Sequence, residues 1–125
     1  MKKVMVVDDD NFTRELISMA LRRHGYEVIA ANDGLHAIMK AQDEKPDLLL
    51  LDVMLPDLSG LEVLNLLQSQ FLIDIPAIIM SRIHHQKVVI AADRLGAIQY
   101  LEKPFEMSDL IEKIQTIPGF MNVSV

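Results

Sequence analysis

The stretch Leu48-Leu49-Leu50-Leu51-Asp52 decides the fold, because four consecutive leucines run directly into an acidic residue. A strand that is apolar at every position has both faces covered, which is typical of a parallel sheet between two layers of helices. The stretch Val4-Met5-Val6-Val7-Asp8-Asp9-Asp10 has the same form. Since the carboxyl ends of parallel strands lie along one edge of a sheet, we expect the two acidic ends to meet there.

Strand and helix signals alternate through the rest of the chain. Gly25 follows one helical pattern and supplies a stop signal, while Leu35, Ile38 and Met39 mark another helix that must end before Pro46. We expect strands at residues 4–7, 27–31, 47–51, 77–80 and 98–101. We expect helices at residues 12–24, from 35 to just before 46, from 61 onward, at 85–95 and at 106–117.

Strand-helix units joined by short connections predict an α/β fold with right-handed crossovers. We expect a doubly wound, five-stranded parallel sheet of the (βα)5 flavodoxin-like type, with strand order 2-1-3-4-5. One domain is predicted over residues 1–117. Residues 118–125 lose the helical period and are either a frayed tail or the start of a linker.

The composition fits a globular protein and excludes several classes. The length of 125 residues suits one domain, and 50% of the residues are hydrophobic. The net charge of −6 argues against direct contact with nucleic acid or an anionic membrane. The absence of cysteine excludes disulfides and thiolate metal sites. No apolar stretch approaches membrane-spanning length, and the N-terminal run is too short for a signal peptide, so we expect a cytoplasmic protein.

The acidic residues at the two strand ends are the first candidates for chemistry. Asp52 alone would be an ordinary loop cap, and Asp8 with Asp9 alone would be a solvated turn. Three carboxylates brought together repel one another, so they either share protons or hold a hard cation. Mg²⁺ takes oxygen ligands and keeps several waters, so two or three carboxylates and a carbonyl are enough. We favour a metal site.

Two further strand ends add polar groups to the same edge. Lys103 precedes Pro104, which disfavours a helix and leaves the lysine extended, with its ammonium able to reach the acids. Ser81 follows the apolar run 77–80, and its hydroxyl is expected beside the same crevice. Taken singly, the lysine reads as a surface residue and the serine as a turn residue.

These motifs together resemble the receiver domain of two-component response regulators over residues 1–117. The resemblance rests on Asp8-Asp9, on Asp52 followed by Val53-Met54-Leu55-Pro56-Asp57-Leu58-Ser59-Gly60, on Ser81, and on Tyr100-Leu101-Glu102-Lys103-Pro104-Phe105. Each motif is weak alone, whereas their order and spacing are specific.

The resemblance implies a phosphoacceptor switch rather than an enzyme. It identifies Asp52 as the acceptor of a phosphoryl group from the phosphohistidine of a sensor histidine kinase or a histidine phosphotransfer protein. It implies Mg²⁺, or Mn²⁺ in its place, as the cofactor. The implied metal ligands are Asp9, Asp52, the backbone carbonyl of Met54, and Asp8 through water.

The resemblance also implies how the signal is passed on. Lys103 matches the lysine that pairs with the phosphoryl oxygens, Ser81 the hydroxyl that moves to bond them, and Tyr100 the aromatic switch. Phosphorylation is then expected to change the binding of a protein target on the face formed by the fourth helix, the fifth strand and the fifth helix.

Some positions depart from the family pattern. Arg82 stands where a small residue is common; its guanidinium either reaches the phosphoryl group or points to solvent, and we favour solvent. Ile98-Gln99 replaces an acidic pair, and Lys113 stands where arginine is frequent in the DNA-binding subfamily. Because the charge pattern for symmetric dimers is incomplete, we expect a monomer or a weak dimer.

Three rival interpretations remain. In the first, the chain is a truncated piece of a larger regulator with a DNA-binding or enzymatic output domain. In the second, it is an aspartate-nucleophile phosphatase, although such enzymes require a second aspartate at the position where this chain has Met54. In the third, it is a flavodoxin-like cofactor binder, although its first loop is acidic, whereas an anionic cofactor needs a Gly- or Ser/Thr-rich loop that binds phosphate.

Overall fold

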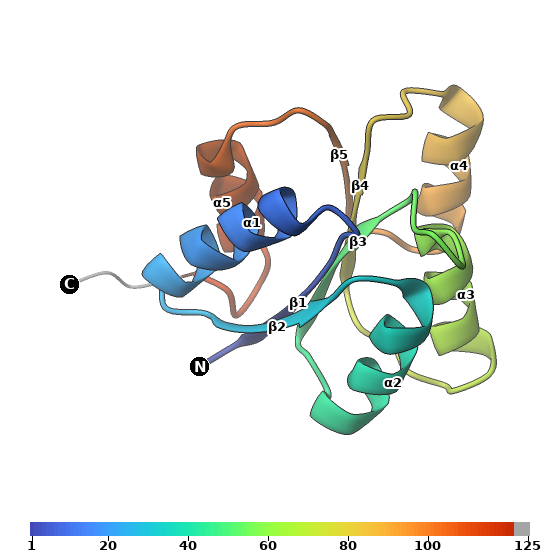
Figure 1. Cartoon of the computed structure of the whole chain (residues 1–125), viewed down its shortest axis with the longest axis horizontal. Helices are drawn as coiled ribbons and strands as arrows, with labels where there is room; N and C mark the ends of the chain where they lie inside the picture. The colour runs from blue at the N-terminus through green and yellow to red at the C-terminus, as the bar shows by residue number, and fades with distance from the viewer. Residues whose placement is uncertain (122–125) are drawn as a thin grey trace.

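A five-stranded parallel sheet forms the middle layer of this computed structural model, which describes residues 1–121 (Figure 1). The strands are β1 (Lys3–Val7), β2 (Glu27–Ala31), β3 (Leu48–Asp52), β4 (Ala77–Ser81) and β5 (Gln99–Glu102). The helices are α1 (Asn11–Arg23), α2 (Gly34–Glu44), α3 (Gly60–Ser69), α4 (Gln86–Arg94) and α5 (Met107–Gln115). The sheet order is β2-β1-β3-β4-β5, so the predicted doubly wound, flavodoxin-like fold is confirmed.

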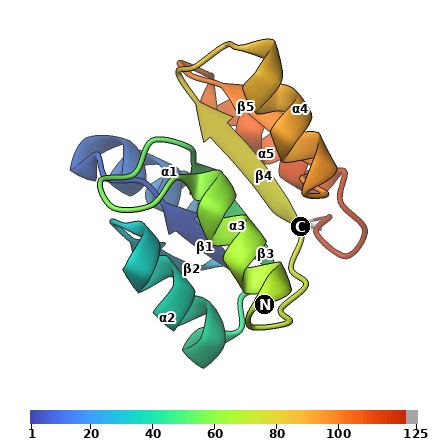
Figure 2. The same ribbon diagram turned by 90° about the vertical axis from the view of Figure 1, so that its right-hand side faces the viewer.

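The helices cover both faces of the sheet. α1 and α5 lie on one face, and α2, α3 and α4 lie on the other, which Figure 2 turns toward the viewer. Side chains alternate between the two cores along each strand. In β3, Leu48 and Leu50 pack with α1 and α5, whereas Leu49 and Leu51 pack with the other three helices. All four leucines are fully buried, as the unbroken apolar run predicts.

Side-chain caps mark the starts of α1, α2 and α3. The side chain of Asp10 accepts from the Thr13 amide at the start of α1, and the side chain of Asp33 accepts from the His36 amide at the start of α2. Ser59 caps α3 with a reciprocal bond to Glu62, which is a capping box. Short polar side chains of this kind satisfy amides that have no partner inside the helix. Within residues 1–121, no helix has the length and apolar character needed to cross a membrane.

Three expectations about the elements need correction. The predicted fifth strand, 98–101, lies one residue later as β5 (Gln99–Glu102). The predicted third strand, 47–51, lies one residue later, because Asp52 pairs with Met80 and is itself part of β3. In α2, only Ile38 of the three marker residues is buried, whereas Leu35 is 60% exposed and Met39 is 59% exposed. The buried face of α2 consists instead of the small residues Gly34, Ala37 and Ala41 together with Ile38.

The end of the chain folds back onto the core beyond α5. Phe120 is buried, and its backbone carbonyl accepts a hydrogen bond from the hydroxyl of Tyr26 at 2.5 Å. The two rings lie 6.3 Å apart between centroids. The predicted division of the chain after residue 117 stays a prediction, and residues 122–125 of the predicted tail lie outside the described residues.

Asp57 ties the loop after β3 to the start of α2. One carboxylate oxygen accepts from the amides of Gly34 and Leu58 at 2.8 Å each, and the other accepts from the Leu35 amide at 2.9 Å. Burial alone would raise the pKa of this carboxyl, but the backbone amides outweigh it and hold the pKa below its usual value of 3.8. The contact fixes the loop that runs from Asp52 to α3.

We predict that Asp57→Asn lowers the thermal midpoint at pH 7 by about 3 °C, because the amide has one acceptor oxygen and no charge at a helix N-terminus. A depressed pKa stabilises the fold fully above pH 3.8, and this stabilisation is lost as the pH falls through the lowered pKa. The midpoints of the two proteins should therefore converge in acid. The control is Asp43→Asn, an exposed position of α2. A deficit that is equal at pH 7 and in acid would contradict this account.

Candidate functional site

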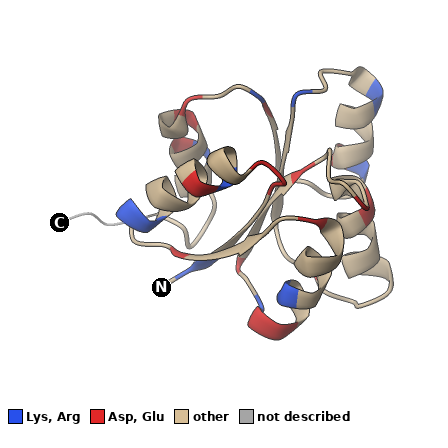
Figure 3. Ribbon diagram, in the orientation of Figure 1, with Lys and Arg blue, Asp and Glu red and all other residues tan. Residues whose placement is uncertain are grey.

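Three carboxylates meet where β1 and β3 end. Asp8 and Asp9 follow β1, Asp52 closes β3, and the two strands are paired neighbours with Val7 opposite Leu51. One oxygen from each carboxylate lies within 4.8 Å of the others. Figure 3 shows these acidic segments converging at the centre of the molecule. The parallel pairing therefore brings together residues that are more than forty positions apart in the sequence.

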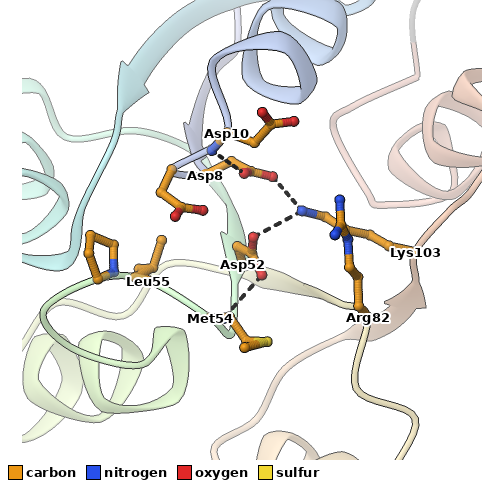
Figure 4. Close-up of a pocket in the computed structure, with 9 residues that line it drawn as sticks. Asp8, Asp10, Asp52, Met54, Leu55, Arg82 and Lys103 are labelled. Atoms are coloured by element: carbon orange, nitrogen blue, oxygen red, sulfur yellow. Dashed lines mark hydrogen bonds and ion pairs between the residues drawn. The ribbon is translucent and has the colours of Figure 1, made fainter.

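Lys103 links two of these carboxylates. Its ammonium nitrogen lies 2.5 Å from an Asp8 oxygen and 2.9 Å from an Asp52 oxygen (Figure 4). The lysine follows β5, and its amide donates to the Ser81 carbonyl at 2.8 Å. The Lys103-Pro104 peptide bond is cis. The lysine thus reaches across from the end of β5 to the ends of β1 and β3.

Both buried carboxylates are held at each of their oxygens. The second oxygen of Asp8 accepts from the Asp10 amide at 2.9 Å, and the second oxygen of Asp52 accepts from the Met54 amide at 3.1 Å. Asp8 is fully buried and Asp52 is 6% exposed, whereas Asp9 is exposed. Two carboxylates with fixed orientation and one with free access to solvent therefore surround the same point.

Burial and charge act in opposite directions on these groups. Burial raises the pKa of Asp52, and the hydrogen bond and charge of Lys103 offset only part of this effect. Burial alone would lower the pKa of Lys103, but its bonds to Asp8 and Asp52 outweigh that effect and raise it. The ammonium therefore stays charged, and it neutralises one of three negative charges. The remaining charge favours a divalent cation.

The donor set suits a hard cation. Carboxylate oxygens are the ligands that Mg²⁺ takes in proteins, usually with several waters retained. Asp9, being exposed, is open to a hydrated ion, while Asp8 and Asp52 offer fixed oxygens. For Met54, the structure describes an amide that donates to Asp52, and the part predicted for its carbonyl stays a prediction.

Ser81 and Tyr100 both form hydrogen bonds with the backbone of Ile83. The fully buried Ser81 hydroxyl accepts from the Ile83 amide at 2.9 Å, and the Tyr100 hydroxyl donates to the Ile83 carbonyl at 2.5 Å. The tyrosine is half-buried. A movement of Ile83, in the loop that follows β4, would therefore change the hydrogen bonds of both side chains. Their predicted roles as switch residues stay predictions.

The acids open into a pocket of about 470 Å³. Its lining residues are Asp8, Asp9, Asp10, Asp52, Met54, Leu55, Pro56, Arg82 and Lys103. Arg82 is exposed, in line with the expectation that it reaches solvent, and it also forms part of the pocket wall. Asp10 lies at the rim, but its carboxylate caps α1, and the bonds from Thr13 lower its pKa.

Two residues that position the site were not identified from the sequence. A side-chain carbon at Gly60 would lie 2.2 Å from the Asp52 carbonyl oxygen, so only glycine lets α3 start so close to β3. Arg14 donates to the Asp8 carbonyl at 2.8 Å and to the Asn11 side chain at 2.6 Å, which braces the acidic turn. The glycine stood in the quoted motif, but its close approach to Asp52 depends on three-dimensional packing.

Comparison with known proteins agrees with this geometry. A sequence model described as the response regulator receiver domain matches residues 4–115. The chain belongs to this family. It is a receiver domain of a two-component response regulator.

Related sequences are signalling regulators of about twice this length. The alkaline phosphatase synthesis transcriptional regulatory protein PhoP of Bacillus subtilis is 40% identical over 116 residues, which cover 93% of this chain and 48% of PhoP. The response regulator MprA of Mycobacterium leprae is 36% identical over 115 residues, which cover 92% of this chain and 50% of MprA. The receiver domain described here thus spans about half the length of these curated relatives.

Solved structures share the receiver fold. A CheY-like receiver domain protein from Methanospirillum hungatei superimposes with a TM-score of 0.87 at 28% identity, covering 93% of this chain and 92% of that chain. The chemotaxis protein CheY4 of Vibrio cholerae gives a TM-score of 0.87 at 30% identity, covering 94% of this chain and 98% of that chain.

We predict that Gly60→Ala destabilises the receiver domain by about 2 kcal/mol, because the added methyl group collides with the backbone of Asp52. The measurement is the free energy of unfolding in urea. Asn65→Ala, at an exposed position of the same helix, is the matched control and should cost little, since alanine is the better helix former. Equal stability of Gly60→Ala and the unmodified protein would contradict the close approach.

Proposed function

We propose that the domain is a phosphorylation switch in which Asp52 accepts a phosphoryl group from the phosphohistidine of a sensor histidine kinase or a histidine phosphotransfer protein. The observation that carries this proposal is the triangle of Asp8, Asp52 and Lys103 beside an open pocket. Phosphoryl transfer needs positioning and neutralisation of charge more than covalent assistance. An oriented carboxylate beside an ammonium meets both needs.

The transfer itself is a simple exchange of bonds. A carboxylate oxygen of Asp52 attacks phosphorus, and the bond from phosphorus to the histidine nitrogen breaks. The electron pair of that bond returns to the imidazole, and the product is an acyl phosphate on Asp52. The Met54 amide holds one Asp52 oxygen, which leaves the oxygen now facing Lys103 to react.

A divalent cation completes the charge balance. We assign Mg²⁺, or Mn²⁺, to Asp9, Asp52, the Met54 carbonyl and, through water, Asp8, and the ion would neutralise the phosphoryl oxygens when bound. The exposure of Asp9 supports its role as a directly accessible ligand. Unlike Asp9, Asp8 is buried, and its carboxylate already binds the Lys103 ammonium at 2.5 Å, which agrees with a contact to the ion through water only.

The acyl phosphate is proposed to act on the rest of the domain through Lys103, Ser81 and Tyr100. A phosphoryl group adds negative charge and acceptor oxygens, to which the Lys103 ammonium and the Ser81 hydroxyl can donate. If the Ser81 hydroxyl turns away from the Ile83 amide, the backbone of Ile83, whose carbonyl also binds the Tyr100 hydroxyl, is free to move. A shift from 1% to 99% of the active state needs about 5.5 kcal/mol, which several charge-assisted bonds supply.

The face formed by α4, β5 and α5 is the proposed output surface. Tyr100 belongs to β5, and Ile98, which directly precedes this strand, is 42% exposed, which gives this face apolar contact area for a protein target. We propose that the domain works in the cytoplasm, as a monomer or weak dimer, without contacting nucleic acid or a membrane itself. We also propose that it has no catalytic turnover beyond its own phosphorylation and dephosphorylation.

A larger regulator is the second candidate. The relatives PhoP and MprA are about twice as long as this chain, which favours a longer regulator that also carries an output domain. The phosphatase interpretation is weaker, since the position two residues after Asp52 carries Met54, whose side chain cannot exchange protons. The phosphoacceptor chemistry proposed for Asp52 is the same whether the receiver domain acts alone or as part of a longer regulator.

The test is incubation with Mg²⁺ and acetyl phosphate, followed by intact-mass measurement. We expect the mass of one phosphoryl group to be added to the unmodified domain, because a single carboxylate has the required surroundings. Asp52→Asn should gain nothing, and removal of Mg²⁺ by a chelator should suppress labelling. Asp43→Asn, which changes an exposed carboxylate of α2, should be labelled normally. Labelling of Asp52→Asn at the rate of the unmodified domain would refute the proposal.

A further inference from the structure

Arg82 is a second cation on the wall of the acidic pocket. It directly follows Ser81, the last residue of β4, and its side chain is exposed while it lines the same pocket as Lys103. Figure 4 shows it extending from the end of β4 toward the side of the pocket where Lys103 lies. The fold therefore brings two positive groups to one side of a pocket whose other polar lining is acidic.

The two cations differ in what they already bind. Lys103 is shared between Asp8 and Asp52 and has a side chain that is only 9% exposed. Within residues 1–121, the Arg82 guanidinium makes no hydrogen bond or ion pair. By contrast, Arg14 in the first turn of α1 already donates to the Asp8 backbone carbonyl and to the Asn11 side chain. Arg82 is thus the uncommitted cation of the pocket.

We propose that Arg82 binds the phosphoryl group, first on the incoming donor and then on Asp52. The inference rests on the proposed function, and it assigns phosphoryl binding to a position at which a small residue is common in the family. A guanidinium presents a planar fork of donors that matches two phosphate oxygens. Its donors are free before the reaction, so binding the phosphoryl group breaks no existing contact of Arg82.

Arg82 and Lys103 have different tasks in this account. An arriving phosphoryl group must compete with two carboxylates for Lys103, since both are within 2.9 Å of its ammonium. Arg82 has no such competitor, so it can capture the donor at the mouth of the pocket before Lys103 is released. Because Arg82 is exposed, its contribution is screened by salt, unlike that of a buried group.

The inference is tested by the rate of labelling with subsaturating acetyl phosphate in Mg²⁺, followed by intact mass. We expect Arg82→Ala to lower this rate about fivefold to tenfold, since a charge-assisted hydrogen bond is lost. Arg82→Lys should give an intermediate rate, because it keeps the charge and loses the fork. The deficit of Arg82→Ala should shrink in high salt, which a purely structural role would not produce.

Arg94→Ala is the matched control, because it removes an exposed arginine of α4 that lies outside the acidic pocket. It should be labelled like the unmodified domain, and all variants should keep the same thermal midpoint. If Arg82→Ala is labelled as fast as Arg94→Ala while Asp52→Asn is not labelled, the proposed function stands and the role of Arg82 is refuted. If the unmodified domain is not labelled at all, the proposed function and this inference both fail.

Discussion

The contact on which the site depends is the ammonium of Lys103 held between the buried carboxylates of Asp8 and Asp52. Two ionised carboxylates at one buried place repel each other, and a cation is the means by which a protein tolerates them. Lys103 supplies that cation from the far strand of the sheet, so the ends of β1, β3 and β5 are held together by one side chain. The remaining negative charge suits a divalent cation, and in the proposed function this cation and the lysine together neutralise an incoming phosphoryl group.

The parts of the fold that follow from local pattern could be predicted. The unbroken apolar runs of β1 and β3 indicated buried parallel strands, and their acidic ends indicated at which edge of the sheet the carboxylates gather. The buried face of α2 could not be read so simply. Its large apolar residues Leu35 and Met39 point outward, because α2 packs closely through glycine and alanines.

The parts of the site that depend on distances between elements were missed. Gly60 matters because the Asp52 carbonyl lies where its side chain would be, and no local pattern reports that distance. Asp57 reads as a loop acid, yet it binds the start of α2, twenty-three positions earlier in the chain. Arg82 is exposed, as expected, but its place on the wall of the acidic pocket depends on the position of its backbone at the end of β4. Sequence indicated which groups have the chemistry, and packing decided which of them share a pocket.

The central claim is that Asp8, Asp9 and Asp52 form one divalent-cation site, and the thermal midpoint in increasing Mg²⁺ tests it most directly. A ligand that binds only the folded state stabilises it by about 2.7 kcal/mol at a hundred times its Kd, so the midpoint of the unmodified domain should rise steadily. Asp9→Asn removes the accessible ligand without disturbing the contacts of Lys103, and its midpoint should stay nearly constant. An equal rise in both proteins would contradict the claim.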